Sequence, residues 1–356
     1  MASGIKSSRP VRVLIVDDSP TVRFIVRKIL SKDPAIEVVG EARGGREAVE
    51  LVRKLRPDVM TLDLRMPDLD GLEVTEIVMA EEPTPILILT SAIDRDEKYT
   101  TFEAISRGAL DVMEKPGPNN GSDWSDSERT LIEKVKLLST IRVVPHVRAR
   151  IHGSEPVRIK TAVIYDFVAI GASTGGPKLL RTLFESLPSD FSLGIALVQH
   201  ITRGFEESFA EWLSRITPFE ARIARDNDVI QPGRILIAPP GFHLIVKNSE
   251  RVGLSDAKPL NGQKPSADFL FMSTSEVFGR RAIGIILSGM GRDGARGLKM
   301  LKGAGGKTMA LREEECAVFG MPKAAFDEGA VDGFSSLSEI IQNLVRAHEN
   351  KKRSFK

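Results

Sequence analysis

The chain has 356 residues, 42% of them hydrophobic and 28% charged, which is enough for two domains that each bury a core. Lysine and arginine (50) nearly balance aspartate and glutamate (48), so a formal charge of +2 excludes nucleic-acid binding through bulk charge. The single cysteine, Cys316, excludes an intramolecular disulfide and a cysteine-rich zinc site. No apolar run reaches the roughly 18 residues of a membrane-spanning helix, and the first ten residues lack an apolar signal core. We therefore expect a cytoplasmic protein without membrane insertion.

Residues 11–138 alternate short β-branched runs with amphipathic stretches, which is typical of βαβ units and a parallel sheet. Ser19 can cap the first helix, with Pro20 in its first turn. The expected strands cover 11–16, 36–41, 58–62, 85–90 and 109–113, and the last helix lies near 126–138. This pattern predicts a five-stranded parallel domain.

Residues 139–160 interrupt the pattern and carry one acid against several bases. The bases are Arg142, Arg148, Arg150, Arg158 and Lys160, and the acid is Glu155. We expect a solvated basic linker, with recognition of an acidic partner as the alternative.

A second α/β pattern covers 161–349. Strands are expected at 167–173, 192–200 and 282–289, and helices from Pro177, over 205–216 and near 266–278. The runs RILIAP (234–239) and FHLIVK (242–247) are predicted to form a hairpin. The expected fold is a doubly wound α/β domain with a mainly parallel sheet and a hairpin.

Acidic side chains end two strands of the first domain. Asp17 and Asp18 follow the first strand and Asp63 follows the third, at the sheet edge where open α/β folds bind ligands. Three carboxylates repel each other unless a hard cation, most plausibly Mg²⁺, lies among them. Thr90 ends the fourth strand and Lys115 follows the fifth, and both suit a phosphoryl group. A carboxylate can itself be the nucleophile in phosphoryl transfer, and Asp63 is our candidate.

Residues 11–122 resemble the receiver domain of two-component response regulators, through VDDS (16–19), DLRMPDLDG (63–71), LTSA (89–92) and EKP (114–116). The resemblance implies a flavodoxin-like fold and phosphorylation of Asp63 by a histidine kinase. It also implies that Asp17, Asp18, Asp63 and the carbonyl of Arg65 surround Mg²⁺.

By the same resemblance, Thr90 and Lys115 bind the phosphoryl oxygens, and the Lys115-Pro116 bond is expected to be cis. Val112 stands where many receivers carry an aromatic switch residue.

The second domain contains Gly171-Ala-Ser173-Thr-Gly175 between an expected strand and an expected helix. This satisfies G-x-S-x-G, the turn that exposes a nucleophilic serine. Backbone N–H groups at the start of the helix, beginning with Thr174, are placed to stabilise an oxyanion. The alternatives are a structural glycine-rich turn and a phosphate-binding loop.

A nucleophilic serine needs a base, and two of the five histidines are candidates. His200 follows a strand at the same sheet edge as Ser173, whereas His243 begins a hairpin strand and is expected to be structural. His146 and His152 lie in the linker and His348 lies near the end of the chain. Asp293 follows another strand and can orient the imidazole.

Two rival features lie near these residues. Gly289-Met-Gly291-Arg-Asp-Gly294 fits the dinucleotide motif G-x-G-x-x-G, and Glu313–Glu315 lie about 20 residues further on. Against this alternative, the motif comes late in its domain. Cys316 is another possible nucleophile, but its apolar neighbours favour burial.

Residues 165–330 resemble the catalytic domain of the chemotaxis protein-glutamate methylesterases, the CheB family. The resemblance rests on GASTGG (171–176), VQH (198–200), LSGMGRDGARG (287–297) and ECAVFGMPKAA (315–325). It implies a triad of Ser173, His200 and Asp293, with the backbone at Thr174 and Met290 lining the oxyanion site.

The expected function is a phosphorylation-activated hydrolase that removes methyl groups from γ-glutamyl methyl esters of chemoreceptors and deamidates selected glutamines. No cofactor is expected for the esterase step, and Mg²⁺ is expected in the receiver. The expected partners are chemoreceptors and a histidine kinase, with no nucleic acid, and the chain is expected to be a monomer. The first alternative is a phosphorylation-gated adaptor with little turnover, and the second is a dehydrogenase.

Overall fold

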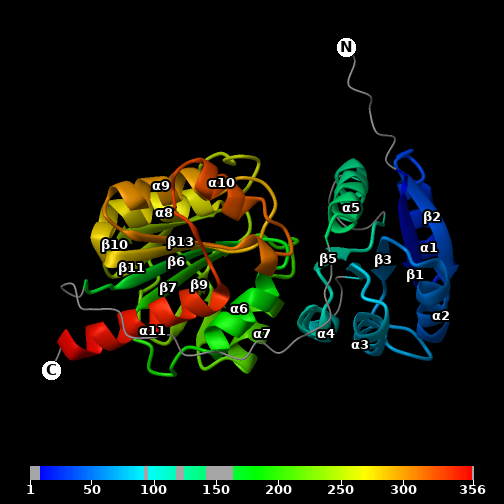
Figure 1. The fold of residues 1–356 in the computed structure, drawn as a ribbon, viewed down its shortest axis with the longest axis horizontal. Coiled ribbons are helices and arrows are strands. Elements are labelled where there is room, and N and C mark those ends of the chain that lie inside the picture. Colours follow the sequence, from blue (N-terminus) through cyan, green and yellow to red (C-terminus); the bar gives the residue numbers. More distant parts are fainter. Residues whose placement is uncertain (1–8, 92–94, 118–123, 142–162, 355–356) are drawn as a thin grey trace, which may run out of the picture. The chain divides into compact units, whose positions relative to one another are not determined.

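Figure 1 shows the computed structural model of the chain, which describes residues 9–91, 95–117, 124–141 and 163–354. The chain divides into two compact units, residues 1–147 and 148–356. Most of the expected linker, residues 142–160, lies outside the described residues. Each unit has its own sheet and its own hydrophobic core.

The first unit is a five-stranded parallel sheet with strand order β2-β1-β3-β4-β5. Its strands are β1 (Val11–Val16), β2 (Ile36–Ala42), β3 (Val59–Leu62), β4 (Ile86–Thr90) and β5 (Asp111–Glu114). Its helices are α1 (Pro20–Leu30), α2 (Gly45–Leu55), α3 (Gly71–Glu81), α4 (Arg95–Arg107) and α5 (Trp124–Leu138). The predicted flavodoxin-like fold is confirmed.

Burial explains these elements. Every residue of β3 and β4 is buried, as expected for central strands covered on both faces. Helices α1 and α5 share one core, to which they contribute Val26, Leu30, Leu131 and Val135. The hydroxyl of Ser19 accepts the Val22 N–H at 3.4 Å, so the predicted cap begins α1.

The second unit is a seven-stranded parallel sheet with strand order β14-β13-β12-β6-β7-β9-β8. Its strands are β6 (Phe167–Ala172), β7 (Gly194–Gln199), β8 (Glu220–Ile223), β9 (Arg234–Ile237), β12 (Ala282–Ile286), β13 (Lys307–Leu311) and β14 (Phe334–Ser335). A separate antiparallel pair is formed by β10 (His243–Asn248) and β11 (Arg251–Ser255). The predicted doubly wound fold with a hairpin is confirmed.

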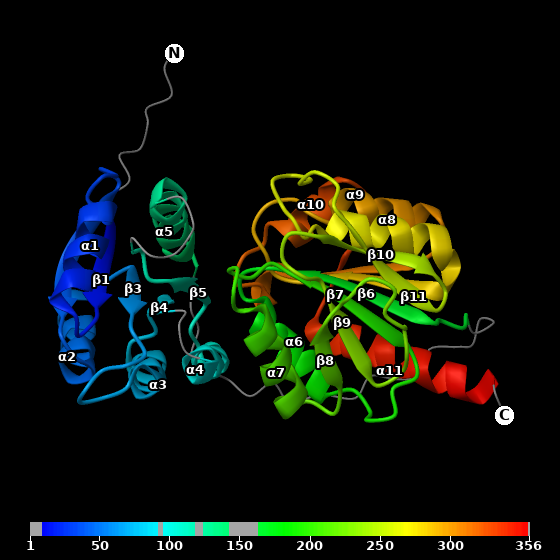
Figure 2. The ribbon, with the colours of Figure 1, turned by 180° about the vertical axis from the view of Figure 1, so that it is seen from behind.

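Helices cover both faces of this sheet. They are α6 (Gly176–Glu185), α7 (Glu206–Ile216), α8 (Ala267–Val277), α9 (Ala295–Gly303), α10 (Met321–Asp327) and α11 (Leu337–Ser354). Figures 1 and 2 show α8, α9 and α10 on one face and α6, α7 and α11 on the other. Every helix in the described part of the chain is too short or too polar to cross a bilayer.

The predicted hairpin partner was wrong. RILI of β9 pairs in parallel with both β7 and β8, and FHLIVK of β10 pairs with β11 instead. Three of the four residues of β9 are buried, which fits an interior strand, whereas the last two residues of β10 are exposed. Both runs look alike in sequence, because each is short, apolar and β-branched.

Candidate functional site

Three carboxylates meet at the carboxyl end of the first sheet. Oxygens of Asp17, Asp18 and Asp63 all lie within 4.8 Å of one another. Asp17 and Asp63 are each 2% exposed, and Asp18 is exposed. The strands that carry them, β1 and β3, are neighbours in the sheet, so their loops open at the same edge.

Lys115 partly neutralises this cluster. Its Nζ lies 2.7 Å from Asp63 Oδ2 and 2.9 Å from Asp17 Oδ2. Burial raises the pKa of Asp63 to about 6, although Lys115 acts to lower it. Burial alone would lower the pKa of Lys115, but the hydrogen bonds and charges of Asp63 and Asp17 raise it. Buried Thr90 lies on β4, between the strands of Asp63 and Lys115, and its carbonyl accepts the Lys115 backbone N–H at 2.8 Å.

The donor set fits a hard divalent cation. Asp63 Oδ1 is buried and accepts no hydrogen bond from the described residues, so one carboxylate oxygen has capacity for a ligand. Asp18 and Arg65 line a common cavity of about 510 Å³ beside the cluster, which gives a ligand access. Carboxylate and carbonyl oxygens are the ligands that Mg²⁺ prefers.

Two further predictions for the first unit concern the Lys115-Pro116 bond and Val112. The Lys115-Pro116 bond is trans, and the cis bond among the described residues is Lys264-Pro265. The expected cis bond was wrong, because trans is the lower-energy state of an X–Pro bond unless the surroundings reverse it. Val112 is 1% exposed and packs in the core, and as a valine it offers no aromatic ring for a rotamer switch.

In the second unit, the loops after β12, β6 and β7 come together, because these three strands are neighbours in the sheet. Ser173 N–H donates to the Ser288 carbonyl at 2.9 Å, and His200 N–H donates to the Ala172 carbonyl at 2.9 Å. Ser288 Oγ donates to the Thr174 carbonyl at 2.7 Å. The turn that carries Ser173 is therefore held by backbone bonds on both sides.

His200 and Asp293 form a close pair. His200 Nε2 lies 2.9 Å from Asp293 Oδ2, and the two side chains are 11% and 2% exposed. Burial alone would raise the pKa of Asp293, but the hydrogen bond and charge of His200, with the hydrogen bonds of Ser266 and Ala267, hold it below its ordinary value. Because Nε2 then carries the proton toward Asp293, Nδ1 is the nitrogen that can accept one.

Ser173 is half-buried, and no hydrogen bond joins its hydroxyl to His200 in the described part of the chain. Gln199 connects their backbones instead, because its Nε2 donates to the Ser173 carbonyl at 2.9 Å and to the His200 carbonyl at 2.8 Å. Gln199 is 4% exposed and was not singled out from the sequence. The signal available in the sequence was a polar residue, Gln199, at the end of the apolar run GIALV.

Gln199→Met is expected to lower the free energy of unfolding by about 1–3 kcal/mol, because the His200 carbonyl loses the Gln199 donor and the Ser173 carbonyl keeps only the Gly176 N–H. The expected hydrolysis of methyl esters should slow as well, because the Ser173 and His200 loops lose the side chain that connects them. Thermal unfolding and methanol release measure the two effects. Gln231→Met is the matched control, because Gln231 is exposed. Wild-type stability of Gln199→Met would contradict this role.

The rival dinucleotide motif lies in the loop between β12 and α9. A Cβ at Gly289 would lie 2.7 Å from the Ser173 Cβ, so this glycine allows the loop to approach the serine turn. Gly294 has φ +87° and precedes α9, a conformation that favours glycine. Asp293, inside the motif, is engaged by His200. Close packing against Ser173 therefore explains Gly289, and a positive φ explains Gly291 and Gly294. Met290 from the same loop is 56% exposed.

Cys316 is a poor nucleophile in this structure. Burial raises the pKa of its thiol to about 12, and the neighbouring Glu315, Glu313 and Glu314 add to the effect. The thiolate, which is the reactive form, is thus suppressed at neutral pH.

Cys316→Ser is accordingly expected to keep turnover within about twofold of the parent protein, because so little of the thiol is in the nucleophilic thiolate form. Methanol release before and after a thiol-alkylating reagent checks this. Loss of turnover in a folded Cys316→Ser protein would make Cys316 a candidate nucleophile again.

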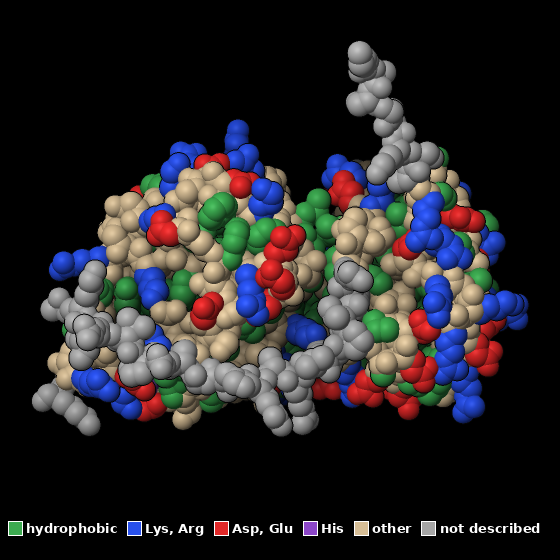
Figure 3. Space-filling view, viewed as in Figure 1, with side chains coloured by type: hydrophobic (Ala, Val, Ile, Leu, Met, Phe, Trp, Pro, Cys, Tyr) green, Lys and Arg blue, Asp and Glu red, His purple; other side chains and the backbone are tan. Residues whose placement is uncertain are grey.

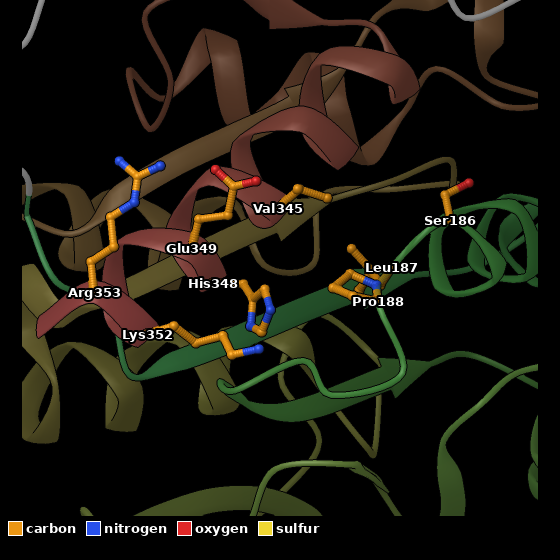
Figure 4. Close-up of a pocket in the computed structure, with 8 residues that line it drawn as sticks. All are labelled: Ser186, Leu187, Pro188, Val345, His348, Glu349, Lys352 and Arg353. Atoms are coloured by element: carbon orange, nitrogen blue, oxygen red, sulfur yellow. The ribbon is translucent and has the colours of Figure 1, made fainter. Parts of the chain in front are cut away.

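The other two described histidines, His243 and His348, have hydrogen-bond partners other than Ser173. His243 is fully buried, as expected of a structural residue, and its contacts are described below. His348 lines a cavity of about 640 Å³ between the end of α6 and α11 (Figure 4). Its Nδ1 accepts the Ser192 N–H at 3.1 Å, and none of Ser173, His200 and Asp293 lines this cavity. Figure 3 shows acidic and basic side chains interspersed over the face in view.

The first unit is a parallel sheet with an acid–lysine pocket. The second is a larger α/β sheet that carries a serine near a histidine–carboxylate pair. Together these features define a receiver-linked hydrolase. Known families agree with this class. Residues 168–344 match the CheB methylesterase family and residues 13–121 match the response regulator receiver domain.

Individual relatives cover nearly the whole chain. A protein-glutamate methylesterase/protein-glutamine glutaminase of Anaeromyxobacter dehalogenans is 42% identical over 94% of this chain and 96% of its own. One of Pyrococcus abyssi is 37% identical over 96% and 95%. The solved catalytic domain of Thermotoga maritima CheB is 35% identical and covers 51% of this chain and 98% of its own, with a TM-score of 0.49. The chain belongs to the CheB methylesterase family, and it is a methylesterase with a response-regulator receiver domain.

Proposed function

We propose that this chain removes methyl groups from γ-glutamyl methyl esters of chemoreceptors, and deamidates selected glutamines, through Ser173, His200 and Asp293. The observation that carries the proposal is the 2.9 Å contact between His200 and Asp293 on loops adjacent to the serine turn. The printed names of the relatives, protein-glutamate methylesterase/protein-glutamine glutaminase, support the substrate class.

In the proposed reaction, His200 Nδ1 accepts the proton of the Ser173 hydroxyl as its oxygen attacks the ester carbonyl. The developing oxyanion is stabilised by backbone N–H groups at Thr174 and Met290. His200 returns the proton to the leaving methoxide, and methanol departs. Water, activated by the same imidazole, then hydrolyses the acyl-serine to a free glutamate and restores the hydroxyl. Asp293 stabilises the imidazolium in both steps.

The receiver is proposed to control this activity. Asp63 would accept a phosphoryl group from a histidine kinase, with Thr90 and Lys115 contacting the phosphoryl oxygens. Asp17, Asp18, Asp63 and the carbonyl of Arg65 would hold Mg²⁺, which neutralises charge on the phosphoryl group when bound. Phosphorylation would shift the population toward an active arrangement of the two domains.

The proposed division is a receiver at 11–138, a basic linker at 139–160 and a catalytic domain at 161–349. The chain is proposed to work in the cytoplasm, where the histidine kinase and the methylated segments of chemoreceptors are accessible to it.

The decisive experiment measures methanol release from membranes containing methylated chemoreceptors, with and without a small-molecule phosphodonor and Mg²⁺. Release that rises with the phosphodonor supports both parts of the proposal. Receptor binding without methanol release would support the adaptor alternative instead.

A further inference from the structure

The carboxylate of Asp293 rests on the first turn of α8. Ala267 N–H donates to Asp293 Oδ2 at 2.6 Å, and Asp268 N–H lies 3.3 Å from Oδ1. The hydroxyl of Ser266, the residue that caps this helix, donates to Oδ1. With His200 on Oδ2, the carboxylate receives four donors from two elements. Its orientation toward His200 therefore depends on where α8 begins.

His243 fixes the position of that helix start. It lies on β10, which packs beside α8 on one face of the sheet (Figure 1). His243 Nδ1 accepts the Ser266 N–H at 3.1 Å, and Nε2 lies 3.2 Å from the Lys258 carbonyl. Because a carbonyl can only accept, the proton of the imidazole is on Nε2. The ring stacks on Phe269, with centroids 3.9 Å apart. His243 is thus a neutral, oriented acceptor for the Ser266 backbone.

We propose that Ser266, held in place by His243, is a positioning residue for the esterase reaction: its hydroxyl fixes the Asp293 carboxylate in the orientation that engages His200. This inference rests on the proposed function of Ser173, His200 and Asp293. Ser266 and His243 are both 0% exposed, so neither is available to contact substrate. They act through Asp293.

A second buried acid, Asp268, increases the need for a donor, such as the Ser266 hydroxyl, that keeps Asp293 ionised. Asp268 is 0% exposed; its carboxylate accepts the Gly297 N–H at 2.7 Å and the Asn261 amide at 3.1 Å. Burial raises the pKa of Asp268, and the nearby Asp293 raises it further. Two carboxylates this close do not both ionise easily. The donors from Ser266 and His200 favour Asp293 as the ionised one.

The test compares Ser266→Ala with Ser336→Ala in full-length protein on methylated receptor membranes. Ser336 Oγ accepts the Glu339 N–H at 3.1 Å at the start of α11, so it is a helix-cap serine of the same domain outside the site. Ser266→Ala should lower kcat by about tenfold to a hundredfold with little change in KM, because a donor to a charged group is lost. Ser336→Ala should lower thermal stability but leave kcat unchanged.

The pH profile of kcat/KM separates positioning from a purely structural role. Without the hydroxyl the Asp293 carboxylate loses one of its donors and becomes more basic. The acid limb of the profile should therefore move to higher pH in Ser266→Ala. A loss of active fraction alone would reduce the amplitude without moving the limb. Ser266→Thr, which keeps the hydroxyl, should restore the parental limb.

Ser266→Gly is the second variant, because glycine is tolerated at helix N-caps while lacking the hydroxyl. It should show the same shifted limb as Ser266→Ala. Parental kcat and profile in either folded variant would overturn the inference, provided that Ser173→Ala is inactive. Turnover by Ser173→Ala would overturn the proposed function itself, so the two failures are distinguishable.

Discussion

Ser173→Ala is expected to lower kcat/KM for methanol release by at least about a thousandfold, since removal of a triad nucleophile leaves only binding and oxyanion stabilisation. The fold should be preserved. Ser173 is half-buried, and its hydroxyl forms no hydrogen bond within the described residues. The measurement is methanol release from methylated receptors, with thermal unfolding as a check on folding.

Ser189→Ala is the matched control, because Ser189 is exposed in the loop after α6. It should retain parental turnover. Parental turnover in Ser173→Ala would instead exclude this serine as the nucleophile and direct attention to a water activated by the His200–Asp293 pair.

Asp63→Asn is expected to abolish stimulation by a phosphodonor. In the proposed phosphorylation, a bond forms between phosphorus and an Asp63 carboxylate oxygen and the bond to the donor breaks. An amide is too weak a nucleophile for this transfer. The ratio of stimulated to unstimulated turnover should fall to one from roughly 5- to 150-fold, the usual range of coupling between two sites.

The same experiment with a chelator tests the metal. Removal of Mg²⁺ should also eliminate stimulation in the parent protein, because the carboxylate cluster then lacks a neutralising cation. Asp126→Asn is the control, since Asp126 is an exposed acid on α5 outside the cluster. Stimulation that persists in Asp63→Asn would place the phosphorylation site at another residue.

Sequence reasoning reached much of the candidate site through strand ends. Asp63, Thr90 and Lys115 end or follow successive strands, and parallel strands open at one edge regardless of their detailed packing. It missed Gln199 and the support of Asp293 by Ser266. Those roles depend on hydrogen bonds between elements far apart in the chain: Ser266 is 27 residues from Asp293 and 23 from His243.

The sequence by itself determined the class of each domain, because the alternation of buried β-branched runs and amphipathic helices admits little besides a parallel α/β sheet. It also determined which reactive side chains stand at strand ends. Only the tertiary structure decided the order of the strands. Buried strands such as β6, β7, β9 and β12 are apolar on both faces, so their sequences do not specify their neighbours. The order β12-β6-β7 brings His200 against Asp293, 93 residues away, on loops next to Ser173.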